Sequence, residues 1–196
     1  MRPLALTWPT NLVFLVLYVW VFLAEFRLVG RAGRSAAARG TQDAGSFRLI
    51  VWGNTVVMVV AVALAALVPA AAIVHRLAAY ATGMASLLAG GLLRRHCFRM
   101  LGEHFTGAVD VRPGQPVIDR GAYRWIRHPS YLAGLLIFAG VGLALENWAT
   151  VVAALAGALA IYAYRIRVEE RALLATLGAP YAAYMRRTRR LVPFVY

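Results

Sequence analysis

The chain has 196 residues, 61% of them hydrophobic, and a net charge of +13 in which every basic residue is an arginine. A soluble globular domain is about 45–50% apolar, so this composition argues against an ordinary soluble fold and indicates a surface that faces lipid. Nucleic-acid binding also uses basic charge, but the long apolar runs favour the arginine bias of membrane-protein loops. The single cysteine, Cys97, excludes an internal disulfide and fits no zinc-binding spacing, so we expect no metal site.

Three apolar segments fill the first half of the chain, at residues 8–28, 47–69 and 73–93. Each is long enough to cross a bilayer as a helix, which rises about 1.5 Å per residue. The first segment is expected to be a retained span, because only Arg2 precedes it and no small-residue cleavage site follows. The polar stretch 30–46 is expected to be a loop or a surface helix. Small residues in the third segment predict close packing against another helix. They are Gly83, Ala85, Ser86, Ala89, Gly90 and Gly91.

The second half begins with a polar region at residues 94–130, where Pro113 and Gly114 break any helix. Two shorter apolar stretches follow at residues 131–145 and 148–164, joined by a two-residue turn. Fifteen residues span only about 22 Å as a helix. The pair is therefore either a thin transmembrane hairpin or a re-entrant pair.

The charged and aromatic tail, residues 165–196, is expected to hold two helices. The first should end at Gly178, which is a natural helix C-cap, and Pro180 could begin the next in its first turn. With five spans, nearly all arginines lie on one side of the membrane. The positive-inside rule then places the N-terminus outside and the C-terminus in the cytoplasm. We therefore expect an all-α integral membrane protein with about five transmembrane helices.

The residues just before the stretch 131–145 carry groups that are suited to binding an anion. They are Tyr123, Arg124, Arg127, His128 and Tyr131. Pro129 is well placed in the first turn of a helix, whose N-terminus favours anions. Arg127 can donate two parallel hydrogen bonds to a carboxylate, and His128 can donate another. The same residue types are ordinary anchors at a lipid headgroup boundary, so composition alone favours anchors.

Two adjacent carboxylates, Glu169 and Glu170, follow the last apolar stretch and stand beside Arg165 and Arg167. Taken alone, they could form surface ion pairs at i,i+3 and i,i+4 spacing, each worth about 0.2–0.5 kcal/mol. However, the helical hairpin returns the chain to the same membrane face, so the two clusters can meet. Together they offer donors for a carboxylate and a carboxylate for an ammonium group. A zwitterionic amino acid, such as the methionine moiety of S-adenosylmethionine, requires this combination.

The two clusters belong to a longer pattern. Its positions are Arg127, His128, Pro129, Ser130, Tyr131, Asn147, Glu169, Glu170, Gly178, Tyr181, Tyr184 and Pro193, with Leu101, Gly102, Phe105, Gly121 and Tyr123 upstream. The pattern resembles the C-terminal signature of isoprenylcysteine carboxyl methyltransferases, and the related phospholipid N-methyltransferases share much of it. The resemblance covers residues 100–196. It implies a membrane methyltransferase that uses S-adenosyl-L-methionine without a Rossmann domain, and no G-x-G-x-x-G motif follows a predicted strand here.

The resemblance also implies roles for the site residues. His128 and nearby donors would hold the carboxylate of the cofactor, and Glu169 or Glu170 its ammonium. The expected cofactor-binding residues are Tyr123, His128, Tyr131, Glu169 and Glu170. The expected catalytic residues are Arg127, Arg165 and Glu169, where either arginine would orient an acidic group of the substrate. On this reading, residues 1–95 form three N-terminal spans of a single membrane domain, and residues 96–196 form the methyltransferase-like part.

The chemistry favours a carboxylate as methyl acceptor, because it is ionised at neutral pH and needs no general base. We therefore expect carboxyl O-methylation of a lipophilic, isoprenylcysteine-like substrate that enters from the bilayer. A phospholipid or small-molecule N- or S-methyltransferase is the nearest alternative. Sterol reductases carry a similar Arg-His-Pro-x-Tyr motif, so an NADPH-dependent membrane reductase stays open, as does a non-enzymatic membrane scaffold. No nucleic-acid partner is expected.

Overall fold

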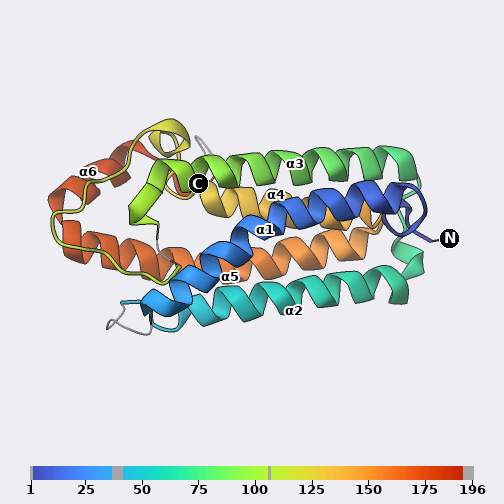
Figure 1. The fold of residues 1–196 in the computed structure, drawn as a ribbon, viewed down its shortest axis with the longest axis horizontal. Helices are drawn as coiled ribbons and strands as arrows, with labels where there is room; N and C mark the ends of the chain where they lie inside the picture. The colour runs from blue at the N-terminus through green and yellow to red at the C-terminus, as the bar shows by residue number, and fades with distance from the viewer. Residues whose placement is uncertain (1, 37–41, 106, 192–196) are drawn as a thin grey trace.

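The computed structural model describes residues 2–36, 42–105 and 107–191. It contains five long helices and a short sixth one: α1 (Thr10–Ala36), α2 (Ser46–Leu67), α3 (Arg76–Leu101), α4 (Pro129–Ala144), α5 (Trp148–Leu177) and α6 (Ala179–Arg187) (Figure 1). Four 3-10 turns accompany them: η1 (Leu4–Leu6), η2 (Pro69–Ala71), η3 (Gly102–His104) and η4 (Gly121–Arg124). The described ranges hold two isolated β-bridges and no strand. The predicted all-α class is confirmed.

The helices run further than the apolar segments that predicted them. α1 continues to Ala36, into the stretch where a loop or surface helix was expected, and α3 continues to Leu101. α5 runs without interruption from Trp148 to Leu177, so the carboxylate cluster lies within the last long helix. Arginine, glutamate and alanine are good helix formers, so a helix can continue through polar residues. Hydropathy therefore indicates which part of a helix faces lipid, but it does not locate the end of the helix.

Gly178 ends α5 as its sequence predicts. Its φ is +59°, which favours glycine, and its N–H donates to the carbonyl of Leu174 over 3.0 Å. Pro180 then occupies the first turn of α6, where its missing N–H costs no hydrogen bond. This break turns α6 back over the end of the helix bundle.

α3 and α4 pack closely because glycines line their contact. A Cβ built on Gly83 would lie 2.5 Å from the backbone nitrogen of Ala144. One built on Gly140 would lie 2.7 Å from the backbone nitrogen of Leu87. Such distances are too short for any side chain, so the two backbones approach each other directly. The close packing predicted for the third apolar segment is confirmed.

The outer face of the bundle is strongly apolar. α2 packs on α5, but Trp52 and Leu67 on α2 are 68% and 76% exposed. By length and composition, α2 and α5 could each cross a membrane, while the apolar helix α4 and the apolar start of α1 are shorter. A soluble protein would bury a helix as apolar as α2, so this exposure fits a lipid-facing surface.

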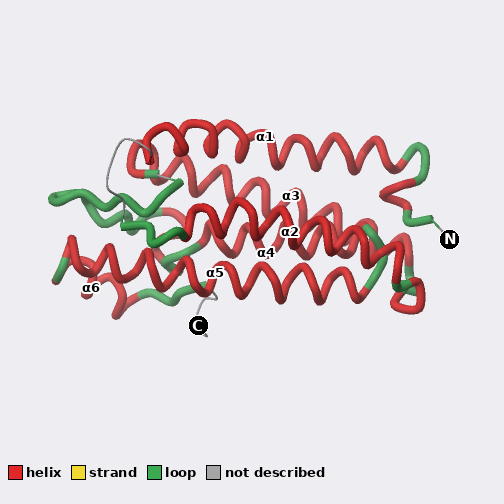
Figure 2. The backbone as a smooth tube through the Cα atoms, turned by 90° about the horizontal axis from the view of Figure 1, so that it is seen from below, coloured by secondary structure: helices red, strands yellow, loops and turns green. Residues whose placement is uncertain are grey.

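The two ends of the bundle differ in chemistry. One end, which we call the far end, holds the N-terminus, the α2–α3 connection and the α4–α5 turn; the other, which we call the site end, holds α6 and the α3–α4 connection (Figures 1 and 2). At the far end, Glu146 accepts the N–H of Leu4 over 2.7 Å and the Nε of Arg76 over 2.6 Å. Asn147 caps α5 by accepting the N–H of Thr150. The predicted turn at Glu146 and Asn147 therefore also holds the N-terminal segment in place, through the hydrogen bond between Leu4 and Glu146.

Candidate active site

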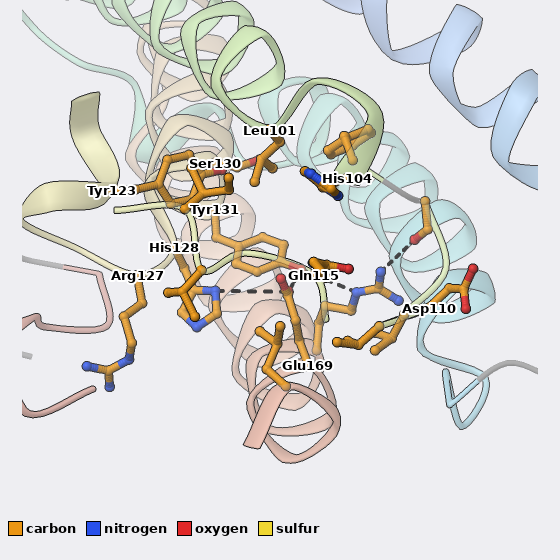
Figure 3. Close-up of a pocket in the computed structure, with 18 of the residues that line it drawn as sticks. Leu101, His104, Asp110, Gln115, Tyr123, Arg127, His128, Ser130, Tyr131 and Glu169 are labelled. Atoms are coloured by element: carbon orange, nitrogen blue, oxygen red, sulfur yellow. Dashed lines mark hydrogen bonds and ion pairs between the residues drawn. The ribbon is translucent and has the colours of Figure 1, made fainter. Parts of the chain in front are cut away.

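A cavity of about 180 Å³ opens at the site end between α3, α4, α5 and the α3–α4 connection. Much of its wall is apolar and includes Phe47, Phe98, Leu101, Val109, Leu173 and Leu177. Five of the polar residues on its wall are Tyr123, His128, Tyr131, Arg165 and Glu169, of which all but Arg165 are labelled in Figure 3. An apolar pocket with a few convergent polar groups is the usual form of a small-molecule site.

The start of α4 presents two of these polar side chains. Pro129 occupies the first turn, so His128 stands at the N-cap and Tyr131 one turn inside the helix. The Tyr131 hydroxyl donates to Oε2 of Glu169 over 2.7 Å and accepts the Nε–H of Arg165 over 3.3 Å. Arg165 and Glu169 lie one turn apart on α5, so a single tyrosine links both of them to α4.

The two adjacent carboxylates of α5 have different partners. Glu169 is 32% exposed in its side chain and lines the cavity. Glu170 is buried, and its Oε1 accepts the Nε–H of Arg127 over 2.7 Å, while its Oε2 accepts from Arg190 over 3.0 Å. Glu169 is therefore the carboxylate that a ligand can reach, and Glu170 belongs to an internal ion cluster.

His128 stands between these two carboxylates. Its Nε2 lies 3.2 Å from Oε1 of Glu170, and its Nδ1 lies 3.9 Å from Oε2 of Glu169. The imidazole is buried, and Figure 3 shows it beside Glu169 in the cavity. The contact with Glu170 fixes the ring orientation, which leaves Nδ1 directed to the Glu169 side.

Arg127 belongs to the internal ion cluster and not to the centre of the cavity. Besides Glu170, its guanidinium donates to the carbonyls of Met185 and Thr188 over 3.2 and 2.5 Å. Figure 3 shows its side chain directed away from Glu169. These bonds hold the C-terminal end of α6 to the start of α4.

Arg165 is held from several sides. Nη1 donates to Asp43 and to the hydroxyl of Ser46, the latter over 2.6 Å, and Nη2 donates to the carbonyl of Gly107 over 2.5 Å. These partners come from the α1–α2 connection, the start of α2 and the α3–α4 connection. The guanidinium therefore joins three segments that are far apart in the sequence.

Three tyrosines close the cavity near α6. Tyr181 and Tyr184 lie on α6, and the Tyr184 hydroxyl donates to the carbonyl of Tyr123 over 2.7 Å. Burial raises the pKa of each of these tyrosines above its ordinary value. Their hydroxyls therefore stay neutral around pH 7 and can serve only as hydrogen-bonding and packing groups.

Five of the side chains that the sequence predicts for the site line the same cavity, and some of their partners were not predicted. Tyr123, His128, Tyr131, Arg165 and Glu169 all line one cavity, whereas Glu170 supports His128 from behind it. The sequence pattern did not predict the contacts of Arg165 with Asp43, Ser46 and Gly107. Asp43 is one of only eight acidic residues and lies three positions before the start of an apolar helix, which is the one sequence signal that marked it. Pro193 lies outside the described residues.

Comparisons with known proteins agree on one family. Residues 81–175 match the model of the isoprenylcysteine carboxyl methyltransferase (ICMT) family. Protein-S-isoprenylcysteine O-methyltransferase B of Arabidopsis thaliana is 30% identical over 115 residues, which are 58% of this chain and 58% of that protein. The Saccharomyces cerevisiae protein-S-isoprenylcysteine O-methyltransferase is 28% identical over 115 residues, 58% of this chain and 48% of the yeast protein. The match thus spans less than two thirds of these relatives.

The fold is also similar to a solved structure, that of the eukaryotic intramembrane Ras methyltransferase ICMT. The superposition has a TM-score of 0.61 at 23% sequence identity, and it covers 76% of this chain and 53% of the other. At this identity the likeness establishes a shared fold.

Proposed function

We propose that this chain is a member of the isoprenylcysteine carboxyl methyltransferase family, whose model its residues 81–175 match, and that it is a membrane methyltransferase that uses S-adenosyl-L-methionine. The proposed acceptor is the carboxylate of an isoprenylcysteine-like lipophilic substrate. The observation that carries the proposal is the reachable carboxylate of Glu169, which lines a mostly apolar cavity beside Tyr131 and His128.

The residues present fit the amino-acid part of this cofactor. Glu169 supplies negative charge for the ammonium group, and His128 at the start of α4 supplies a donor for the carboxylate from Nδ1 in its imidazolium form, in which both ring nitrogens carry a proton. Phe98 and Leu101 add apolar wall for the adenosyl part. Glu170 acts through His128, whose ring it orients. When bound, the cofactor supplies an electrophilic methyl group on a sulfonium centre.

Arg165 is the proposed partner of the acceptor carboxylate. A guanidinium has five N–H groups, and within the described part of the chain four of them meet Tyr131, Asp43, Ser46 and Gly107. The fifth, on Nη2, is available for a carboxylate oxygen of the acceptor. An ionised carboxylate needs no base, so alignment and exclusion of water would supply most of the rate enhancement.

The proposed topology has five spans, α1 to α5, in one membrane domain. Arginines gather in the last turns of α3, in the second half of α5 and in α6, all at the site end. The far end has Arg2 and Arg76, and Arg76 is paired with Glu146. The positive-inside rule then supports a cytoplasmic site end and C-terminus, with the N-terminus outside. The apolar outer face of α2 would let a lipophilic acceptor arrive from the bilayer.

Calorimetry with S-adenosylmethionine in detergent tests the cofactor site. The wild type should bind in the micromolar range, about −8 kcal/mol, and Glu169→Gln should bind at least tenfold more weakly. Asp119→Asn is the matched control, because it also neutralises an acidic residue but in an exposed ion pair with Arg187. A folded wild type that gives no binding heat would refute the proposal.

Methyl transfer tests the acceptor class. The wild type should transfer a labelled methyl group to a farnesylcysteine with a free carboxylate. It should not transfer one to the methyl ester of that compound, whose carboxyl group is already methylated and has no ionised oxygen. Transfer to a phospholipid amine in place of farnesylcysteine would keep the enzyme class and replace the substrate class.

A further inference from the structure

An aspartate from the N-terminal half of the chain contacts Arg165, one of the residues that line the cavity of the candidate site. Asp43 lies on the α1–α2 connection and is 6% exposed. It stands 122 positions before its partner Arg165 in the chain. A carboxylate is rarely buried without a charged partner, so its position calls for a specific role.

Asp43 is hydrogen-bonded on both oxygens. Oδ1 accepts from the guanidinium of Arg165, from the hydroxyl of Ser46 over 2.9 Å and from the N–H of Val109 over 2.9 Å. Oδ2 accepts the N–H of Phe47 over 2.7 Å. The carboxylate is thus fixed by backbone donors from two segments before it meets Arg165.

Arg165 has an alternative partner on its own helix. Glu169 follows it by four residues, which is the spacing at which an arginine and a glutamate on a helix pair with each other. The two side chains make no ion pair in the described part of the chain, and the Tyr131 hydroxyl bonds to both of them instead. Asp43 and Ser46 instead accept from Nη1 of the guanidinium, and Gly107 accepts from Nη2.

We propose that Asp43 is a positioning residue that holds Arg165 apart from Glu169, and so keeps the Glu169 carboxylate free for the cationic group of the ligand. The proposal rests on the proposed function, which assigns the cofactor ammonium to Glu169. Asp43 supplies the competing negative charge, and a charge-assisted hydrogen bond is about twice as strong as a neutral one. Without that charge, Arg165 turns to Glu169 and occupies the ammonium site.

The test is a double-mutant cycle read by S-adenosylmethionine binding. Asp43→Asn should weaken binding at least tenfold, because Arg165 then competes for Glu169. Arg165→Gln alone should stay within threefold of the wild type. The double variant Asp43→Asn, Arg165→Gln should regain the affinity of Arg165→Gln, since no cation is left to occupy the site. Ser46→Ala is the control, because it removes a neutral partner of the same guanidinium and should change affinity less than threefold.

Three results would overturn the proposal. One is wild-type affinity in Asp43→Asn, and the second is a double variant that binds as weakly as Asp43→Asn, which is what a purely structural role predicts. The third is a loss of more than tenfold in Arg165→Gln, which would make Arg165 itself a cofactor ligand. If Asp43→Asn fails to fold, the S-adenosylmethionine affinity of Arg165→Gln can still overturn the proposal. Failure of the proposed function is separate, because it shows as no binding by the wild type.

Discussion

Tyr131 on α4 donates its hydroxyl to the carboxylate of Glu169 on α5, with 2.7 Å between the two oxygens. The bond crosses the cavity wall where the two helices meet. It leaves Glu169 with one oxygen fixed and the rest of its side chain partly exposed. Among the residues that the structure describes, orientation of this carboxylate therefore depends on a single neutral donor from the neighbouring helix.

Replacement of Tyr131 by phenylalanine tests this dependence. A hydrogen bond to a charged group contributes about 1.5–3 kcal/mol, so we expect S-adenosylmethionine affinity to fall by about tenfold or more in calorimetry. Tyr164→Phe is the matched control, since its hydroxyl donates to the carbonyl of Ala44 outside the cavity. Equal affinities of Tyr131→Phe and the wild type would mean that Glu169 is oriented by other groups.

The internal ion cluster around Glu170 predicts a loss of stability. Glu170→Gln leaves the largely buried guanidinium of Arg127 without its charge partner, and removal of one member of a buried pair costs about 3–5 kcal/mol. We expect the melting temperature in detergent to fall by several degrees. Asp119→Asn, in an exposed pair with Arg187, should cost at most about 1 kcal/mol. Similar shifts for both variants would contradict a structural role for the cluster.

The glycine contact between α3 and α4 predicts a steric effect. Gly83→Val places atoms against the backbone of Ala144 and Gly140, which cannot give way without separating the helices. Over-packing of this kind costs about 1–3 kcal/mol or more. Ala85→Val, at an exposed position on the same helix, should leave the melting temperature nearly unchanged. A Gly83→Val protein as stable as Ala85→Val would show that the helices are further apart than described.

Asp43 predicts a dependence of stability on pH. Burial alone would raise its pKa, but N–H donors from Phe47 and Val109 and the charge of Arg165 hold that pKa below the ordinary value. A carboxyl group whose pKa is lowered by folding stabilises the protein above about pH 4, and this stabilisation is lost as pH falls through the folded-state pKa.

Thermal unfolding in detergent between pH 3 and 7 checks this dependence. The melting temperature of the wild type should exceed that of Asp43→Asn at pH 7, and the difference should shrink below about pH 4. A difference that stays constant over the whole range would exclude a contribution from the Asp43 charge.

The local features of the fold could be predicted from the sequence because their causes are local. The apolar segments locate the five long helices. The glycines of α3 predict a close helix contact, and Gly178 with Pro180 predicts the break before α6. The ends of α1 and α3, and the continuity of α5 past residue 164, were not predictable in this way, because the helices continue through residues that are both polar and helix-forming.

The candidate site, like the fold, has a part that could be predicted from the sequence and a part that could not. His128, Tyr131 and Glu169 are close to the ends of one hairpin, so the predicted topology already brings them together. Asp43 could not be assigned, because its contact with Arg165 joins a loop and a helix from opposite halves of the chain. A single aspartate in a polar loop has the same sequence pattern whether it is solvated or buried.

The uninterrupted course of α5 also fixes a distance within the site. Arg165 and Glu169 are four residues apart on one rigid helix, so about 6 Å of axial rise separates them, whatever the packing around them. The helix thus sets the spacing between Arg165, the group proposed to bind the acceptor, and Glu169, the group proposed to bind the cofactor. Glu170, one residue on, is rotated by about 100° and faces Arg127 instead. Insertion of one residue after Arg165 would apply that same rotation to Glu169, turning it out of the cavity while every side chain of the site was still present.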